Sequence, residues 1–158
     1  MKIKIILTVF TLCFFLWGCS NDDEYRDMEK PSIDMSIDDA YPTNCALLYR
    51  GETFSFRAIF TDNNELGDYN IEIHNNFDHH SHSTDDVECD LEPKKKPVNP
   101  FIYNQDFSIP NGKTTFKTED AIFIPNDVDT GDYHFMIRLT DKAGWQQLKA
   151  VSIKIKDE

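Results

Sequence analysis

The sequence predicts an all-β protein with an immunoglobulin-like antiparallel β-sandwich. Aromatic residues make up 13% of the chain and β-branched residues are frequent, a composition that favours strands. The sequence shows no sustained apolar stripe at helical spacing, and turn-forming residues separate short segments in which apolar and polar residues alternate. The roughly 140 residues beyond an N-terminal apolar segment suit one domain with one core.

The N-terminal segment is typical of a bacterial lipoprotein signal peptide. Two lysines precede an apolar run at residues 5–17, which is shorter than the roughly 20 residues that cross a bilayer as a helix. The run ends in LWGC at residues 16–19, which resembles a lipobox. We therefore expect a signal peptide at residues 1–18 and a lipidated Cys19, whose acyl chains would hold the protein on a membrane. The alternative is an ordinary secretory signal followed by a chance cysteine.

Residues 19–30 are expected to form the lipidated cysteine and a flexible acidic tether, with the folded domain at residues 31–158. The acidic run SNDDE at residues 20–24 resembles the signal that exports many Bacteroidota lipoproteins to the outer face of the outer membrane. A plain tether is the alternative, because such a polar segment cannot bury a core. The expected location is the bacterial outer membrane, facing either the periplasm or the exterior.

The charge balance argues against a nucleic-acid partner. The whole chain has a formal net charge of −12. Removing residues 1–18 takes away two lysines and no acidic residue, so 14 basic residues then face 28 acidic ones and the charge becomes −14. A basic surface is what a nucleic-acid phosphate backbone requires.

Strands are predicted wherever apolar and polar residues alternate. In chain order they are residues 31–38, 45–49, 53–60, 69–74, 101–109, 113–118, 121–124, 133–140 and 145–156. Asn111-Gly112 is expected to be a hairpin turn between two of them, and residues 75–100 form a long polar loop. The D-x-G-x-Y pattern that ends at Tyr133 resembles the tyrosine corner that opens strand F of immunoglobulin-like sandwiches.

This alternation also predicts which side chains enter the core. The residues expected to be buried are Tyr69, Ile71, Ile73, Tyr133, Phe135 and Ile137.

Two of the four cysteines remain after processing, Cys45 and Cys89. In an oxidising envelope compartment they most simply form a disulfide. It would close a loop of about 45 residues and stabilise the fold by roughly 4 kcal/mol. The alternative is that Cys89 is a thiolate metal ligand close to the histidines.

The histidines are the candidate functional residues. Four of the five, His74, His79, His80 and His82, fall within nine residues, and the fifth is His134. If residues 69–74 are strand C and residues 133–140 are strand F, these strands are antiparallel neighbours. His74 and His134 would then lie opposite each other on the outward face, with Cβ atoms roughly 5 Å apart.

This arrangement predicts a site for Zn²⁺ or Cu²⁺ made by three or four of the histidines. Asp78, Asp85 and Asp86 are expected as oxygen ligands or as acceptors that orient the imidazoles. Nickel and haem remain alternatives as the bound group. So do a calcium site in the acidic loops, although no EF-hand spacing is present, and a solvated polar loop with no metal.

Several motifs together resemble a family of uncharacterised Bacteroidota lipoproteins that have an immunoglobulin-like domain of unknown function. They are the lipobox, Cys45 and Cys89, IEIHNNFDHHSH at residues 71–82, and GDYHF at residues 131–135. The resemblance extends over most of the chain from Pro31 onward. It implies the sandwich and a joint role for the five histidines, and it implies no established activity.

The sequence therefore predicts a lipid-anchored cell-envelope protein, not an enzyme, that binds a transition metal for capture, buffering or delivery. Its expected partners are the membrane and the metal ion. The alternative is a surface interaction or adhesion module in which the histidines and any metal are structural. A third hypothesis is a zinc hydrolase, for which Glu72 is the candidate general base.

Overall fold

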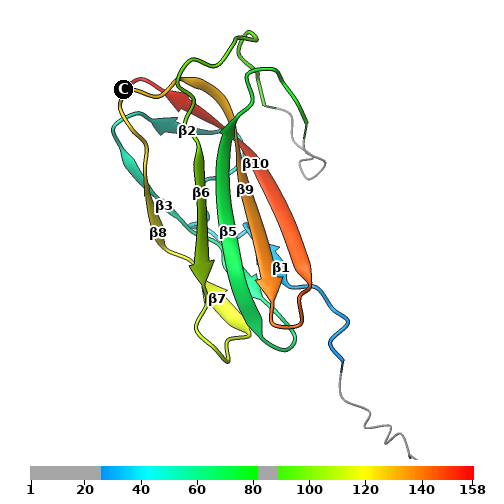
Figure 1. Ribbon diagram of the computed structural model, residues 1–158. Coiled ribbons are helices and arrows are strands. Elements are labelled where there is room, and N and C mark those ends of the chain that lie inside the picture. The colour runs from blue at the N-terminus through cyan, green and yellow to red at the C-terminus, as the bar shows by residue number, and fades with distance from the viewer. Residues whose placement is uncertain (1–25, 82–88) are drawn as a thin grey trace, which may run out of the picture.

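The computed structural model describes residues 26–81 and 89–158, and its regular structure is β-strand throughout (Figure 1). The strands are β1 Ser32–Asp34, β2 Ala46–Tyr49, β3 Thr53–Phe56, β4 Ile59–Thr61, β5 Leu66–Asn75, β6 Tyr103–Ser108, β7 Thr115–Lys117, β8 Asp120–Phe123, β9 Gly131–Asp141 and β10 Gln146–Lys156. Residues 26–81 and 89–158 contain no apolar helix of a length that could span a bilayer.

The strands form two layers. One is a five-stranded sheet in the order β2-β10-β9-β5-β6, and the other combines the sheets β1-β4-β7 and β3-β8. In this second layer, β3 and β4 are separated only by residues 57–58, and β7 and β8 only by residues 118–119. The predicted immunoglobulin-like β-sandwich is confirmed.

One strand pair differs from the predicted antiparallel arrangement. β2 runs parallel to β10, with Ala46 opposite Ile153 and Tyr49 opposite Lys156. The reason is that β1 belongs to the other layer. The chain crosses from one layer to the other before β2. It then pairs with the edge of β10 that β9 does not occupy, and β2 and β10 run in the same direction.

The turn at Asn111-Gly112 is present, but the predicted hairpin is wrong. Gly112 has a φ of 75°, a backbone conformation that favours glycine. β6 on one side of the turn pairs with β5, whereas β7 on the other side pairs with β4. The turn therefore connects the two layers. Local turn chemistry predicts that the chain reverses, whereas burial of each strand's apolar face decides its partner.

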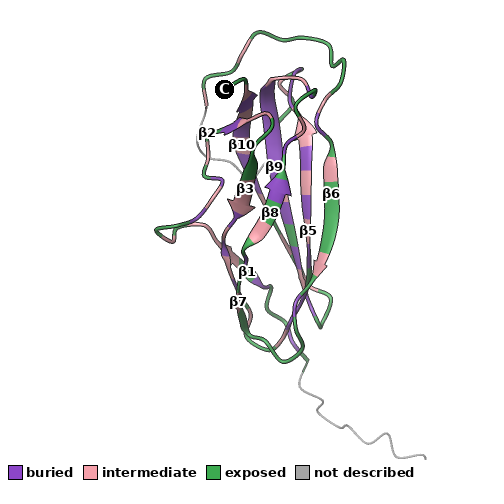
Figure 2. Cartoon of the chain, turned by 90° about the vertical axis from the view of Figure 1, so that its left-hand side faces the viewer, coloured by how far each residue is buried: buried purple, intermediate pink, exposed green. Residues whose placement is uncertain are grey.

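The core lies between the layers, and its centre is the pairing of β5 with β9 (Figure 2). Ile71 pairs with Ile137 and Ile73 with Phe135. Aromatic side chains of the second layer pack onto them, and the ring of Phe56 lies 5.2 Å from that of Phe135. The predicted buried set is confirmed, since all of its members are at most 4% exposed, namely Tyr69, Ile71, Ile73, Tyr133, Phe135 and Ile137.

Tyr133 forms the predicted tyrosine corner. Its hydroxyl donates a hydrogen bond to the Asp129 carbonyl oxygen (2.6 Å) and accepts one from the Phe101 backbone N–H (3.1 Å). Burial raises the pKa of the Tyr133 hydroxyl to about 12, so this group stays protonated and able to donate. The corner fixes the start of β9, where His134 lies.

The folded unit begins before residue 31 and includes part of the expected tether. Asp27 is only 6% exposed, and the Trp145 indole N–H donates to its carbonyl oxygen (3.0 Å). The segment before β1 therefore packs against the β9–β10 turn, earlier in the chain than the expected boundary at residue 31.

Candidate metal centre

The pairing of β5 with β9 places two histidines directly opposite each other. His74 pairs with His134, and their ring centroids are 5.5 Å apart. Both side chains lie on the face away from the core, so the predicted register is confirmed. His134 is nevertheless only 4% exposed, because the segment after β5 covers it.

This covering segment, residues 76–80, is held on the sheet by a buried aromatic ring. Phe77 is 3% exposed, and its ring packs edge-on against Tyr133 at a centroid distance of 5.3 Å. Gly131 makes this contact possible, because it has a φ of 125° and a Cβ there would lie 3.0 Å from Phe77 Cε1. The Asn76 N–H also donates to the Asp132 carbonyl oxygen (2.8 Å). The chain therefore folds back across the start of β9.

The fold-back brings a third imidazole to the pair. The His80 ring is nearly parallel to that of His74 (5.4 Å between centroids, 15° between planes) and meets that of His134 edge-on (5.1 Å). The Nε2 atoms of His74 and His80 are 3.3 Å apart. We call His74, His80 and His134 the histidine triad.

Carboxylates lie on the far side of two rings of the triad. Asp78 Oδ1 is hydrogen-bonded to His80 Nδ1 (2.6 Å), and this bond lowers the pKa of Asp78. Glu72 Oε1 lies 3.0 Å from His74 Nδ1. A carboxylate at Nδ1 favours the tautomer that carries its proton there, which leaves the lone pair on Nε2. The two Nε2 atoms lie within hydrogen-bond distance at 3.3 Å, so they can share one proton or hold a metal ion between them.

The spacing of these two atoms matches that of ligands to one tetrahedral ion. Zn–N bonds of about 2.0–2.1 Å at a tetrahedral angle separate two nitrogen ligands by about 3.3–3.4 Å. His134 is arranged differently, because its Nε2 donates to the His80 carbonyl oxygen (3.2 Å). In that neutral tautomer, its lone pair is on Nδ1.

The remaining predicted site residues are not part of the triad. His79 has a φ of 61°, which turns its side chain away from that of His80, and its Nε2 donates to the Glu92 carbonyl oxygen (2.8 Å). His82, Asp85, Asp86 and Cys19 lie outside the described residues. The structure thus brings together three of the five predicted histidines.

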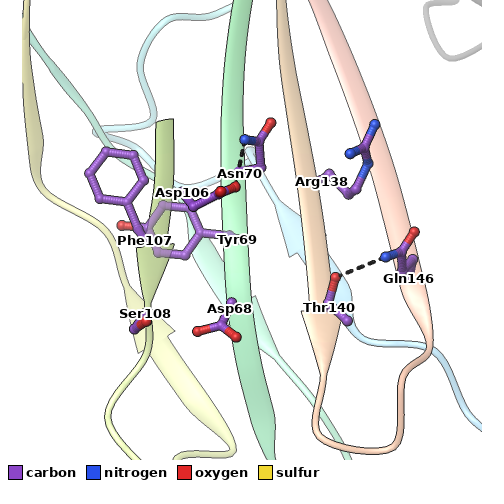
Figure 3. A pocket seen from close by; sticks show the side chains of 9 residues that line it. All are labelled: Asp68, Tyr69, Asn70, Asp106, Phe107, Ser108, Arg138, Thr140 and Gln146. Atoms are coloured by element: carbon purple, nitrogen blue, oxygen red, sulfur yellow. Dashed lines mark hydrogen bonds between the residues drawn. The ribbon is translucent and has the colours of Figure 1, made fainter. Parts of the chain in front are cut away.

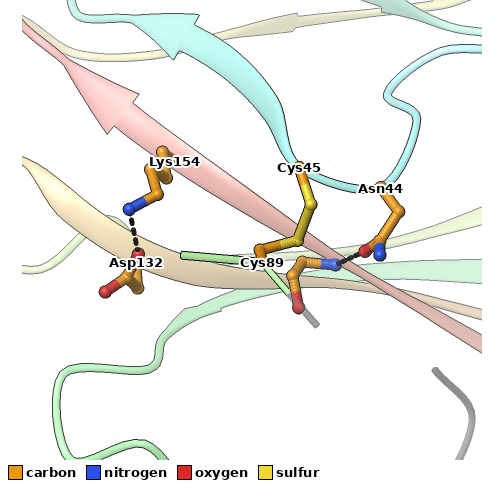
Figure 4. The surroundings of a disulfide bond; sticks show 6 residues. Asn44, Cys45, Cys89, Asp132 and Lys154 are labelled. Carbon is orange, nitrogen blue, oxygen red and sulfur yellow. Dashed lines mark hydrogen bonds and ion pairs between the residues drawn. A yellow bond between two sulfur atoms is a disulfide. The ribbon is translucent and has the colours of Figure 1, made fainter. Parts of the chain in front are cut away.

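A disulfide joins Cys45, just before β2, to Cys89, which lies 44 residues further along the chain (Figure 4). Beside it, Asn44 Oδ1 accepts a hydrogen bond from the Ser152 N–H (2.8 Å). Cys89 is therefore a half-cystine in this structure and not a thiolate ligand. The bond attaches the chain beyond the histidines to the edge of the five-stranded sheet.

A second polar surface lies on the outer face of the same sheet, toward the other end of the strands (Figure 3). Asn70 donates to Asp106 Oδ1 (2.7 Å), and Gln146 donates to Thr140 Oγ1 (3.2 Å). Arg138 is exposed between them and forms no ion pair with a described residue. The side chains on this polar surface line a shallow hollow. The sequence does not predict the hollow, because outward-facing polar residues are ordinary on a solvated strand face.

The fold and the triad define an all-β, immunoglobulin-like domain with clustered imidazoles at one end of its larger sheet. The chain belongs to the DUF4625 family, a domain of unknown function whose family model matches residues 17–156. The expected membership of a family of unknown function is confirmed. The Bacteroidota origin, the lipid anchor and the histidine segment as a family feature stay predictions.

Comparison with solved structures finds several similar protein chains. No curated protein matches the chain. Among solved structures, a GspB Siglec domain is similar, with 21% sequence identity and a TM-score of 0.44. The match covers 84% of this chain and 60% of that one, so the chain spans about 60% of the length of this relative.

Reduction of the disulfide between Cys45 and Cys89 is expected to lower the free energy of unfolding by up to about 4 kcal/mol, because it releases a long loop in the unfolded chain. Urea unfolding of oxidised and reduced protein measures the difference. The Cys45→Ser/Cys89→Ser variant is the control, since its stability should not respond to reductant. Free alkylation of both cysteines in unreduced protein would contradict the assignment.

Proposed function

We propose that this protein is a lipid-anchored cell-envelope protein whose immunoglobulin-like domain binds one Zn²⁺ or Cu²⁺ ion through His74 and His80 of the histidine triad. The observation that carries the proposal is the 3.3 Å separation of the Nε2 atoms of His74 and His80. It equals the spacing of two imidazoles on one tetrahedral ion. Both ions accept imidazole ligands, so the chemical class is a borderline transition metal.

The surroundings of the triad support metal binding over a solvated loop. His74 and His134 are fixed by strand pairing, which orders them before an ion arrives. Carboxylates at the Nδ1 atoms of His74 and His80 are the usual partners of metal-bound imidazoles, because they set the tautomer and raise ligand basicity. Burial of His134 under the covering segment keeps competing water away.

A structural role for the histidines is the second candidate function, and it suits a surface interaction module. The observation in its favour is that contacts within the chain hold the covering segment on β9. His134 donates to the His80 carbonyl, and Phe77 is buried against Tyr133. Chelation separates the two functions. An ion that staples the loop makes folding depend on metal, whereas an ion that the protein carries and delivers leaves the apo fold intact.

The hydrolase hypothesis finds less support. A general base must reach the water on a metal ion. Glu72 lies against Nδ1 of His74, on the opposite side of the ring from the Nε2 atoms that face each other. That carboxylate is placed to orient the imidazole.

A His74→Ala/His134→Ala double variant is expected to lose at least about 100-fold in affinity for Zn²⁺ and Cu²⁺, because it removes one Nε2 ligand and the imidazole that holds the His80 carbonyl oxygen in place. Isothermal titration calorimetry of the purified protein measures this loss. His79→Ala is the matched control, since its imidazole bonds to Glu92 instead of joining the triad, and it should bind as the parent does. Parental affinity in the double variant would contradict the proposal.

The same titration carries a pH signature. The ligands must be neutral, so affinity should fall as the pH drops through the region near 6.5 where imidazole ordinarily titrates. The sign follows from proton competition, since protons and metal ions bind the same lone pairs. Affinity that is unchanged between pH 7.5 and about 5.5 would exclude imidazole ligands.

The proposed anchor is tested separately. A Cys19→Ala variant is expected to move from the membrane fraction to the aqueous fraction, because the acyl chains supply the membrane affinity. Detergent phase partitioning followed by immunoblotting measures the distribution. Cys13→Ala is the control, since Cys13 lies within the expected signal peptide. A Cys19→Ala protein that stays entirely with the membranes would contradict lipidation at this residue.

A further inference from the structure

Three aspartates meet at the end of the sandwich opposite to the histidine triad. Asp62 directly follows β4, Asp141 is the last residue of β9, and Asp27 lies in the segment before β1. One carboxylate oxygen from each lies within 4.8 Å of the other two. His134 and Asp141 are seven residues apart on one strand, or about 23 Å, so the two clusters are separate.

Each of these carboxylates uses one oxygen to hold the local backbone. Asp27 Oδ1 accepts from the Glu29 N–H (3.0 Å), Asp62 Oδ2 from the Asn64 N–H (2.9 Å), and Asp141 Oδ1 from the Trp145 N–H (2.8 Å). These bonds fix the orientation of all three groups.

The second oxygen of each carboxylate is buried and has no hydrogen-bond partner among the described residues. These atoms are Oδ2 of Asp27, Oδ1 of Asp62 and Oδ2 of Asp141. Asp27 and Asp141 are 6% and 4% exposed as whole residues. No described lysine or arginine forms an ion pair with any of the three. Buried polar atoms are normally satisfied, and three carboxylates this close repel one another unless a cation lies between them.

We propose that Asp27, Asp62 and Asp141 bind a Ca²⁺ ion. The ligands are hard oxygens only, as Ca²⁺ requires, and two oxygens on opposite sides of Ca²⁺ are separated by about 4.6–5.2 Å, twice a Ca–O bond. Backbone carbonyl oxygens and water complete such a coordination shell. A surface hollow beside Asp27, lined also by Arg26, Asn64, Glu65, Lys142 and Trp145, gives solvent access.

The ion would tie the N-terminal segment to two turns of the domain. Asp27 is 118 residues from Trp145, which already contacts it, and Asp62 and Asp141 lie at the ends of strands β4 and β9, which belong to different layers. With the anchor proposed at Cys19, the bound ion would fasten the chain eight residues beyond the lipid. Calcium would then restrict the orientation of the domain relative to the membrane. The calcium site itself does not depend on the anchor or on the histidine triad.

Titration of the chelator-treated full chain, purified in detergent, with CaCl2 tests this proposal. Calorimetry should detect one site with a dissociation constant of about 0.1–1 mM, the range of extracellular calcium modules, and the melting temperature should rise and return to its starting value with EGTA. An absent response at about 10 mM Ca²⁺ would overturn the proposal. An equal response to Mg²⁺ would overturn the assignment to calcium.

An Asp62→Asn variant separates an ion site from a hydrogen-bonded network. The amide keeps the shape of the side chain and an oxygen that can accept the hydrogen bond from the Asn64 N–H. It removes one negative charge, so Ca²⁺ affinity should fall at least about tenfold. Without Ca²⁺, this variant should melt at or above the parental temperature, because the repulsion is reduced. Asp34→Asn is the matched control, since Asp34 makes the same kind of turn with Ser36 outside the cluster. A parental Ca²⁺ response in Asp62→Asn, or a lower melting temperature without Ca²⁺, would overturn the proposal.

Discussion

The antiparallel register between β5 and β9 is the constraint on which the rest of the structure depends. It pairs Ile71 with Ile137 on the inner face and His74 with His134 on the outer face. Side chains alternate along a strand, so a shift of one residue would turn the isoleucines toward solvent and a histidine into the core. The core and the histidine triad are therefore two consequences of one pairing.

The third member of the triad depends on contacts outside the strands. Phe77 fills the space above Gly131, which lacks a side chain there, and its burial against Tyr133 holds the covering segment on β9. Tyr133 is fixed in turn by the tyrosine corner. His80 is thus placed over His134 by packing. Such a site is ordered before any ligand binds, and this lowers the entropy lost on binding.

The two-residue alternation of apolar and polar side chains was enough to predict β5 and β9. In β5, for example, the alternation at Tyr69, Ile71 and Ile73 shows directly which face is buried. Other features depend on long-range contacts that a local pattern does not encode. The left-handed backbone conformation at His79 decides that His80, and not His79, joins the histidine triad. Asp27 lies in a segment with no alternation of apolar and polar residues that would predict its burial, and its contact with Trp145 reveals it.

The two ends of the sandwich differ in ligand chemistry, imidazole nitrogen at one and carboxylate oxygen at the other, and this difference allows a direct test of the central claim. Anomalous scattering at the zinc edge from Zn²⁺-soaked crystals locates the ion. We expect one peak about 2.0–2.1 Å from Nε2 of both His74 and His80. No zinc peak at these atoms, or zinc found only at carboxylates, would contradict metal binding by the histidine triad.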